Sequence, residues 1–450
     1  MPPPTPISRI CTNRIGTAVA AAMVLCAAPA LAQVTSLGEA TSWLEAKAQQ
    51  LVRQSRTAMN NRTSAFIPQA GGGYESFWLR DYAYMLEGRL DAFSNKELID
   101  SCNVFVNAMR KDGAGVDCVK LDGTPIYKPG GGSMGENPVA DGSMFTVEVA
   151  WYTWQKTKDR QWLSGIIDKL AKTMKAAPRN PGTGLVYIKP GDPRAGTPDR
   201  CPYGFTDTIR KEGDELFCSL LYVQACRQLG DLMEAADRPD DARRWRGEAA
   251  RLAPVIRDTF WDEKAGLFRA ATVRCRQPDI WGSAFAVYLD VATLEQARTI
   301  ARYFKEHYGE LVQKGQIRHL PGGIYWEAGC ERDTYQNGGY WATATGWFVY
   351  TLDLVDPKLA ERTVIDLVND FRQRGVSEWV FGPHQGVKNY LASATMPLAG
   401  VKKMLARRSS AKTEDLTTEY CVLCTENPGA VHLLTACLRG GRRDVLAAER

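Results

Sequence analysis

Six short segments combine tryptophans with carboxylates, amides and glycines in a way that the rest of the chain does not. They are residues 77–82, 137–142, 203–208, 277–282, 322–341 and 377–390. Aromatic rings stack on the apolar faces of sugars, and Asp, Asn, Gln and Arg side chains hydrogen-bond to sugar hydroxyls. Five of the twelve tryptophans lie in these segments: Trp78, Trp281, Trp326, Trp341 and Trp379. The pattern therefore predicts a carbohydrate site.

The expected ligands of the carbohydrate are polar and aromatic side chains from all six segments: Trp78, Arg80, Asp81, Asp141, Tyr203, Trp281, Trp326, Glu327, Gln336, Asn337, Trp341, Trp379 and His384. Each single member also has a plain structural interpretation. A tryptophan can be part of the core, and Asp81 can form a structural pair with Arg80. The residues that carry chemistry must therefore be judged as a set.

The segments recur every 53 to 74 residues, which is about the length of one helical hairpin. Two kinds of helix alternate along the chain. Residues 162–174, 242–260, 294–311 and 364–371 have one apolar stripe, whereas 216–225, 282–292, 340–354 and 390–404 are apolar or small almost all round. Helices of the second kind are enclosed by others. We therefore expect an all-α fold, an (α/α)6 barrel of six hairpins, with short β-hairpins near 116–127, 184–189 and 267–273.

The two ends of the chain differ from this pattern. Residues 1–32 contain Arg9 and Arg14, an apolar run and the triplet Ala30-Leu31-Ala32. This is typical of a secretory signal peptide and predicts an exported protein, periplasmic or secreted, with an uncleaved anchor as the alternative. The expected barrel covers 33–409. Residues 410–450 are polar and cysteine-containing, and we expect a C-terminal extension there.

Composition and motifs exclude several classes of function. The formal net charge is +5 over 450 residues, without a dense Lys/Arg run, so no nucleic-acid partner is expected. No phosphate-binding or dinucleotide-binding glycine motif is present, and no cofactor is expected. Cys421, Cys424, His432 and Cys437 do not have the spacing of a common zinc site, so no metal is expected. After signal cleavage no membrane contact is expected. The expected partner is a carbohydrate substrate.

Two motifs resemble a known superfamily. Trp78-Leu79-Arg80-Asp81 opens the second expected helix, and Phe260-Trp261-Asp262-Glu263 is followed by Gly266-Leu267-Phe268. Both look like the six-hairpin glycosidases, which have the (α/α)6 barrel and include trehalases, glucoamylases, processing α-glucosidases and α-L-rhamnosidases. The resemblance covers about 36–405. It concerns the fold and does not name a substrate.

The resemblance implies an inverting glycoside hydrolase with two carboxyls about 6.5–9.5 Å apart. In related α-glucosidases the general acid is an Asp after a Gly-aromatic pair. Gly204-Phe205-Thr206-Asp207 matches with one residue inserted, so Asp207 is the candidate acid. The general base is a Glu before the last inner helix, where Glu378-Trp379 precedes Gly382-Pro383. Asp141 is a second candidate acid. Glu327 is a second candidate base, and Asp333, which also lies in the fifth segment, is a weaker third candidate.

Structural alternatives exist for the two catalytic candidates as well. Asp207 can cap the following helix, and Glu378 can be a solvated residue at the rim of the site. Two other functions also remain open. One is a toroidal polysaccharide lyase or sugar epimerase that uses His319, His384 or Tyr203 as proton carrier. The other is a carbohydrate-binding scaffold without catalysis.

Overall fold

The computed structural model describes residues 32–127, 139–190 and 209–426, with side chains to residue 410. The described residues from Val34 onward belong to one compact unit. The described part contains thirteen α-helices and fourteen short strands. The description below concerns this unit alone.

Six of the helices form a closed inner ring. They are α2 (Leu79–Arg89), α4 (Gly142–Thr157), α6 (Leu216–Ala235), α8 (Ile280–Tyr288), α11 (Thr345–Leu352) and α13 (Ala392–Glu426). Each contacts the next in this order, and α13 contacts α2 and closes the ring. The prediction of an (α/α)6 barrel is confirmed.

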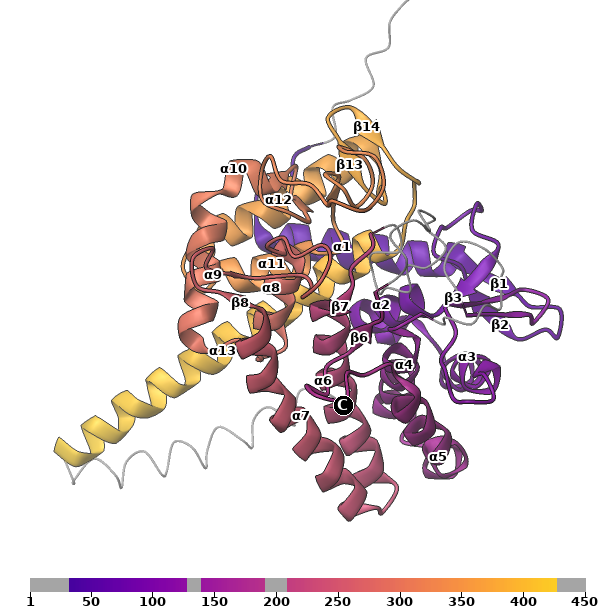
Figure 1. Cartoon of the computed structure of the whole chain (residues 1–450). Coiled ribbons are helices and arrows are strands. Elements are labelled where there is room, and N and C mark those ends of the chain that lie inside the picture. Colours follow the sequence, from indigo (N-terminus) through magenta and orange to yellow (C-terminus); the bar gives the residue numbers. More distant parts are fainter. Residues whose placement is uncertain (1–31, 128–138, 191–208, 427–450) are drawn as a thin grey trace, which may run out of the picture. The chain divides into compact units, whose positions relative to one another are not determined.

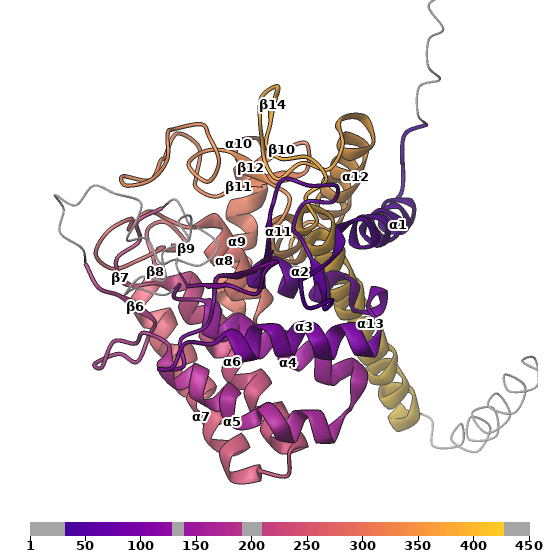
Figure 2. The ribbon, with the colours of Figure 1, turned by 90° about the vertical axis from the view of Figure 1, so that its right-hand side faces the viewer.

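Six further helices of the described part lie outside the ring. They are α1 (Leu37–Ser55), α3 (Asn95–Ala108), α5 (Arg160–Ala176), α7 (Pro239–Phe260), α9 (Leu294–Glu306) and α12 (Pro357–Arg374). Figure 1 and Figure 2 show two of them, α5 and α7, in the lower part of each view. The one-turn helix α10 (Tyr308–Leu311) follows α9. Each outer helix precedes or follows an inner one in the chain, which gives the alternation expected from the hydrophobic pattern.

Burial explains why the sequence separates the two kinds of helix. All nine residues of α8 and all eight of α11 are buried, because these helices have neighbours on every side. In α9 only Ala297, Ile300, Ala301 and Phe304 are buried, at spacings of one to four residues. Such a stripe covers the inner ring while the charged face meets water. A helix that is apolar all round is stable only when it is enclosed.

Short antiparallel strands decorate one end of the barrel. In Figure 2 they lie in the upper part of the view, above α5 and α7. The pairs near the expected hairpins are β4 (Cys118–Lys120) with β5 (Pro125–Ile126), and β8 (Trp261–Asp262) with β9 (Leu267–Phe268). Strand β3 (Ser76–Trp78) adds to β4, and β6 (Tyr187–Ile188) pairs with β7 (Gly213–Asp214). Strands β1 (Arg56–Ala58) and β2 (Ser64–Phe66) form a separate hairpin.

A five-stranded sheet was not expected from the sequence. It joins β10 (Val312–Gln313), β11 (Gln316–Arg318), β12 (Tyr340–Trp341), β13 (Val380–Phe381) and β14 (His384–Gln385). Each strand has only two or three residues, which is too short for an alternating pattern to show in the sequence. The pairing of β12 with β13 places the fifth and sixth predicted segments next to each other.

The predicted chain boundaries stay predictions. Helix α13 runs without a break from Ala392 to Glu426 and so crosses the expected boundary at 409/410. Nearly all of the predicted signal peptide lies outside the described residues. Within the part of the chain that is described, none of the helices has the length and apolarity to cross a membrane.

Candidate functional site

The inner helices begin at the end of the barrel that carries the strands. The residues directly before them are Trp78, Asp141, Glu215, Asp279, Ala344 and Leu391. Consecutive helices run alternately up and down, so all six inner helices begin at the same end, and segments far apart in sequence meet there. We call the side chains gathered at this end the rim cluster. It comprises the aromatic rings at this end and the charged side chains Arg80, Asp81, Asp117, Asp141, Lys211, Glu215, Asp279 and Glu378.

A continuous chain of ring contacts connects four of the six predicted segments. Trp78 lies 5.9 Å from Tyr74, Tyr74 lies 6.4 Å from Tyr390, and Tyr390 lies 6.5 Å from Trp341, measured between ring centroids. From Trp341 the chain continues to Trp281 at 6.0 Å, to His319 at 3.9 Å and to Trp326 at 5.0 Å. Residues from 74 to 390 therefore converge, as the carbohydrate-site hypothesis requires.

Glu378, the predicted general base, is held in this cluster. It is 4% exposed, and its Oε1 accepts a hydrogen bond from the Tyr74 hydroxyl at 2.9 Å. Tyr74 follows Gly71, Gly72 and Gly73, whose φ angles are 92°, 118° and 103°. Residues with side chains rarely adopt such angles, so this turn depends on glycine. The alternative that Glu378 is a solvated rim residue does not fit this burial.

Asp81 is bound by a different tyrosine. The Tyr390 hydroxyl donates to Asp81 Oδ1 at 2.7 Å, and Asp81 is buried. Burial raises the pKa of Asp81 above its ordinary value, although the Tyr390 hydrogen bond and the Arg80 charge act in the opposite direction. The site thus contains two carboxyls, Asp81 and Glu378, each oriented by one tyrosine.

Arg80 contacts two carboxylates other than that of Asp81, its neighbour in the sequence. Its Nε lies 2.9 Å from Asp141 Oδ2, and one of its terminal nitrogens lies 3.7 Å from Asp117 Oδ1. Adjacent residues of a helix point in different directions, so Arg80 and Asp81 meet different partners. Asp141, a predicted ligand and second candidate acid, is 1% exposed, and its carboxylate forms an ion pair with the guanidinium of Arg80.

A buried ionic group joins two inner helices and was missed in the sequence. Lys211 Nζ lies 3.1 Å from Glu215 Oε1 and 3.3 Å from Asp279 Oδ2. Both carboxylates also cap their helices, because Glu215 accepts from the Cys218 amide at 2.6 Å and Asp279 from the Gly282 amide at 2.7 Å. The signal for the caps was present, since Asp279 precedes an apolar helix. Nothing in the sequence marked Lys211 as their shared cation.

Burial and the charges of the neighbouring groups act in opposite directions on the pKa values of this group. Burial alone lowers the pKa of Lys211, but the carboxylates of Glu215 and Asp279 outweigh it and hold that pKa above its ordinary value. Burial likewise acts to raise the pKa of Asp279, but Lys211 and His319 hold it below its ordinary value. His319 Nε2 lies 3.2 Å from Asp279 Oδ1, and burial lowers the pKa of the imidazole.

The fifth predicted segment uses most of its polar atoms to build its own fold. Asn337 accepts from the Trp326 amide at 2.8 Å and donates to the Cys330 carbonyl at 2.7 Å. The Trp326 indole donates to the Gln336 carbonyl at 3.1 Å. Glu327 is exposed and accepts from the Cys275 amide at 2.6 Å. These contacts fit a structural role for Glu327 and Asn337.

The remaining predicted residues are placed as follows. The Trp281 indole donates to the Ile317 carbonyl at 3.2 Å, and its ring stacks on His319, so both features fit core packing. Trp379 is partly buried, 6.5 Å from the Tyr335 ring. His384 is exposed on β14. Asp207 and Tyr203 lie outside the described residues.

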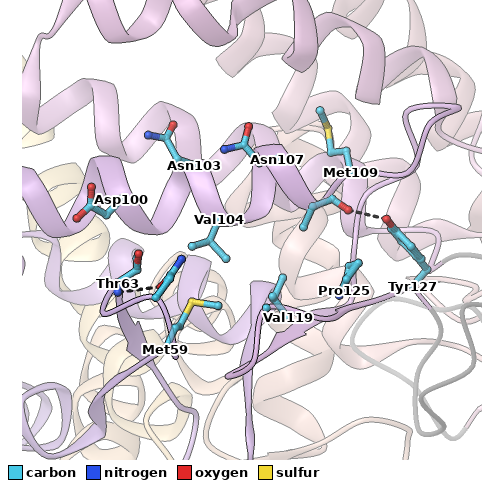
Figure 3. Close-up of a pocket in the computed structure, with 13 residues that line it drawn as sticks. Met59, Thr63, Asp100, Asn103, Val104, Asn107, Met109, Val119, Pro125 and Tyr127 are labelled. Atoms are coloured by element: carbon cyan, nitrogen blue, oxygen red, sulfur yellow. Dashed lines mark hydrogen bonds between the residues drawn. The ribbon is translucent and has the colours of Figure 1, made fainter.

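The groove beside α3 lacks the predicted ligands. This groove of about 430 Å³ lies between Val104 and residues Met59 and Val119, and no predicted ligand lines it (Figure 3). Among described residues, no group of three or more His, Cys, Asp or Glu side chains is arranged to hold a metal ion. The rim cluster is therefore the candidate site.

Comparison with known proteins supports the fold. No protein-family model and no curated protein sequence matches the chain. The GH63 mannosylglycerate hydrolase of Thermus thermophilus, solved with glucose, is 16% identical with a TM-score of 0.56, over 79% of this chain and 99% of that one. The chain has the six-hairpin glycosidase fold.

Two rhamnosidases share this fold. That of Klebsiella oxytoca, solved with rhamnose bound, is 14% identical with a TM-score of 0.56, over 80% of this chain and 63% of that one. The GH78 rhamnosidase of a Bacillus species is 15% identical with a TM-score of 0.54, over 81% of this chain and 34% of that one. These neighbours are glycoside hydrolases, and at such identities the likeness concerns the fold.

Proposed function

We propose that the chain is an exported glycoside hydrolase that inverts the anomeric configuration, with Glu378 as general base and Asp207 as general acid. The observation that carries the proposal is the environment of Glu378. This carboxylate is buried among aromatic rings at the N-terminal end of the inner helices and is fixed by Tyr74. The neighbours that share the fold are glycoside hydrolases, two of them solved with glucose or rhamnose.

The proposed reaction needs two carboxyls with different tasks. Glu378 accepts a proton from a water molecule, which attacks the anomeric carbon from the face opposite the leaving group. The Tyr74 hydrogen bond to Oε1 orients this carboxylate. Asp207 supplies a proton to the departing glycosidic oxygen, a role based on the sequence resemblance.

The remaining rim cluster would bind the sugar before and during this step. Asp81 and Asp141 supply carboxylate acceptors for hydroxyl pairs, and Trp78 supplies an aromatic face. Asp81 and Asp141 are already oriented by Tyr390 and Arg80. Pre-oriented acceptors lower the cost of ordering the site when substrate binds.

The histidine-based alternative has less support. His319 is 2% exposed, stacks on Trp281 and binds Asp279, so its environment fits a structural role. His384 is exposed on β14. Among the described residues, His319 lies beside a carboxylate but is buried, whereas His384 is exposed and forms no ion pair with a carboxylate.

The test compares Glu378→Gln and Asp207→Asn with the wild type on a panel of aryl glycosides and disaccharides. Each change keeps the size of the side chain and removes its acid-base function. We expect kcat to fall by at least about 10²-fold in each variant, since general acid-base groups contribute about 10² to 10⁴. Proton NMR of the first-formed sugar would show the inverted anomer.

Glu295→Gln is the matched control, because this carboxylate is exposed on the outer helix α9. It should keep wild-type turnover and unfolding temperature. Near wild-type activity of Glu378→Gln, in a protein that turns over its substrate, would contradict the role of this residue. Retention of configuration would contradict the mechanism. Release of unsaturated uronides would favour a lyase.

A further inference from the structure

Carboxylates outnumber cations in the rim cluster. Six carboxyl side chains lie there, each in a residue at most 7% exposed: Asp81, Asp117, Asp141, Glu215, Asp279 and Glu378. Two side chains that carry a permanent positive charge, Arg80 and Lys211, lie among them. A site of this composition repels anions, and low solvent access weakens the screening of that repulsion.

Both cations are already engaged by carboxylates of the protein. Arg80 binds Asp141 at 2.9 Å and lies 3.7 Å from Asp117. Lys211 lies 3.1 Å and 3.3 Å from Glu215 and Asp279. An anionic group on a substrate would have to displace a carboxylate from one of them. The displaced carboxylate would then be buried without a counter-ion, which costs several kcal/mol.

Neighbouring basic residues are engaged as well. Arg210 and Arg274 lie 3.0 Å and 3.6 Å from Glu212. Arg318 donates to the Ile324 carbonyl at 3.1 Å and stacks on Tyr325 at 4.9 Å. The two internal segments outside the described residues, 128–138 and 191–208, contain four acidic and three basic residues in their sequence. Their composition has no positive excess.

We infer that the sugar ring bound at the rim cluster is uncharged, and that the site rejects uronic acids and phosphorylated or sulfated sugars. This inference rests on the proposed function and names its substrate class. An uncharged sugar satisfies the cluster through its hydroxyls, which donate to carboxylate oxygens. Its apolar face meets the aromatic rings. The carboxylate of a uronic acid only accepts hydrogen bonds, and the carboxylates of the rim cluster also only accept them, so the two groups have no hydrogen bond to share.

The experiment compares matched aryl glycosides on the full-length protein: glucosides, mannosides and rhamnosides, the corresponding glucuronides, and the methyl esters of those glucuronides. The ester keeps the shape of the uronide and removes its charge. We expect kcat/KM for the uronide to be at least about 100-fold below that of the matched glucoside. We expect the ester to recover most of this difference.

A variant tests whether the carboxylate excess causes the discrimination. Asp117→Asn removes one negative charge next to Arg80 and should narrow the glucoside-to-uronide ratio about tenfold. Asp258→Asn removes one charge from an exposed position on α7 and should leave the ratio unchanged. Saturation-transfer NMR with methyl glucoside and methyl glucuronide measures binding directly and covers the case of slow turnover.

The outcomes separate this inference from the proposed function. Hydrolysis or binding of the uronide within tenfold of the neutral sugar would overturn the inference and leave the glycosidase proposal standing. The same holds for an Asp117→Asn variant that leaves the ratio unchanged. If the protein neither binds nor cleaves any of the neutral sugars, the glycosidase proposal and the inference both fail.

Discussion

Replacing Lys211 by methionine isolates the ionic link between two inner helices. Lys211 is fully buried, and its Nζ lies 3.1 Å from Glu215 Oε1 and 3.3 Å from Asp279 Oδ2. Methionine has a similar length and no charge. The substitution therefore fills the space and leaves two carboxylates buried without their shared cation.

The structure sets the size of the expected effect. At an effective dielectric constant of about 20, each contact has a Coulomb energy of about 5 kcal/mol, and most of it offsets the cost of burying the ions. Breaking a buried pair by removing one partner costs about 3–5 kcal/mol. For a chain of this size that loss lowers the unfolding temperature by about 4–6 °C.

The pH dependence of the loss follows from the pKa of Asp279. In the wild type this pKa is held below its ordinary value, so its stabilising contribution is present above the ordinary value and is lost as the pH falls through the lowered one. Without Lys211 the pKa of Asp279 rises, because burial still raises it and one of the two charges that lower it is gone. The deficit of the variant should accordingly be greatest near pH 7 and smaller near pH 4.

Thermal and urea unfolding, followed by circular dichroism at pH 7 and pH 4.5, measure this effect. The double variant Lys211→Met/Asp279→Asn removes one of the stranded charges, and its Asn oxygen still caps α8 at the Gly282 amide. It should be more stable than Lys211→Met alone. A loss below about 1 kcal/mol for the single variant, or strict additivity of the two changes, would refute the reasoning.

Two further predictions concern stability. Burial, together with the charge of Glu87, holds the pKa of Glu148 well above its ordinary value of 4.5. The contribution of the protonated side chain to the free energy of unfolding is therefore complete below pH 4.5 and is lost as the pH rises through the raised pKa. Glu148→Gln should match the wild type in thermal unfolding near pH 4 and exceed it by at least about 1 kcal/mol near pH 8, and an advantage that shrinks with rising pH would contradict this. A Cβ on Gly400 would lie 2.2 Å from the Gly346 Cα, where α13 crosses α11, so Gly400→Ala should cost at least about 2 kcal/mol in urea unfolding. Gly247→Ala is the control, because Gly247 is exposed on α7 with open space around it, and this change should raise the free energy of unfolding by about 0.5–1 kcal/mol. If both changes had the same effect, the close packing of α13 on α11 would not explain the loss at Gly400.

The sequence allowed most of the helical architecture to be predicted, because burial leaves a periodic record. Ala242, Trp245, Ala249, Leu252 and Ile256 mark the stripe of α7, and all are buried. The enclosed segment 340–354 shows the limit of this method. Its first residues, Tyr340 and Trp341, form β12, and α11 begins at Thr345. A short strand and a buried helix are equally apolar, so periodicity does not separate them.

The candidate site was predictable in composition and less so in its partners. The tryptophans and carboxylates that flank the inner helices follow from segment spacing. The partner of each polar group does not. Arg80 meets Asp141 and Asp117, and Tyr74 meets Glu378 across 304 residues. Pairings of this kind depend on side-chain directions in the folded barrel, which residue types alone do not specify.

The sequence by itself determined that six helical hairpins form and that their connecting segments carry aromatic, carboxyl and amide side chains, because amphipathicity and residue type are local properties. Tertiary structure alone decided which carboxylate is held by which donor, and that Lys211, Glu215 and Asp279 form one buried group. The physical reason is that hydrogen bonds and ion pairs act over about 3 Å. Only the closure of the ring brings residues from distant hairpins within that distance.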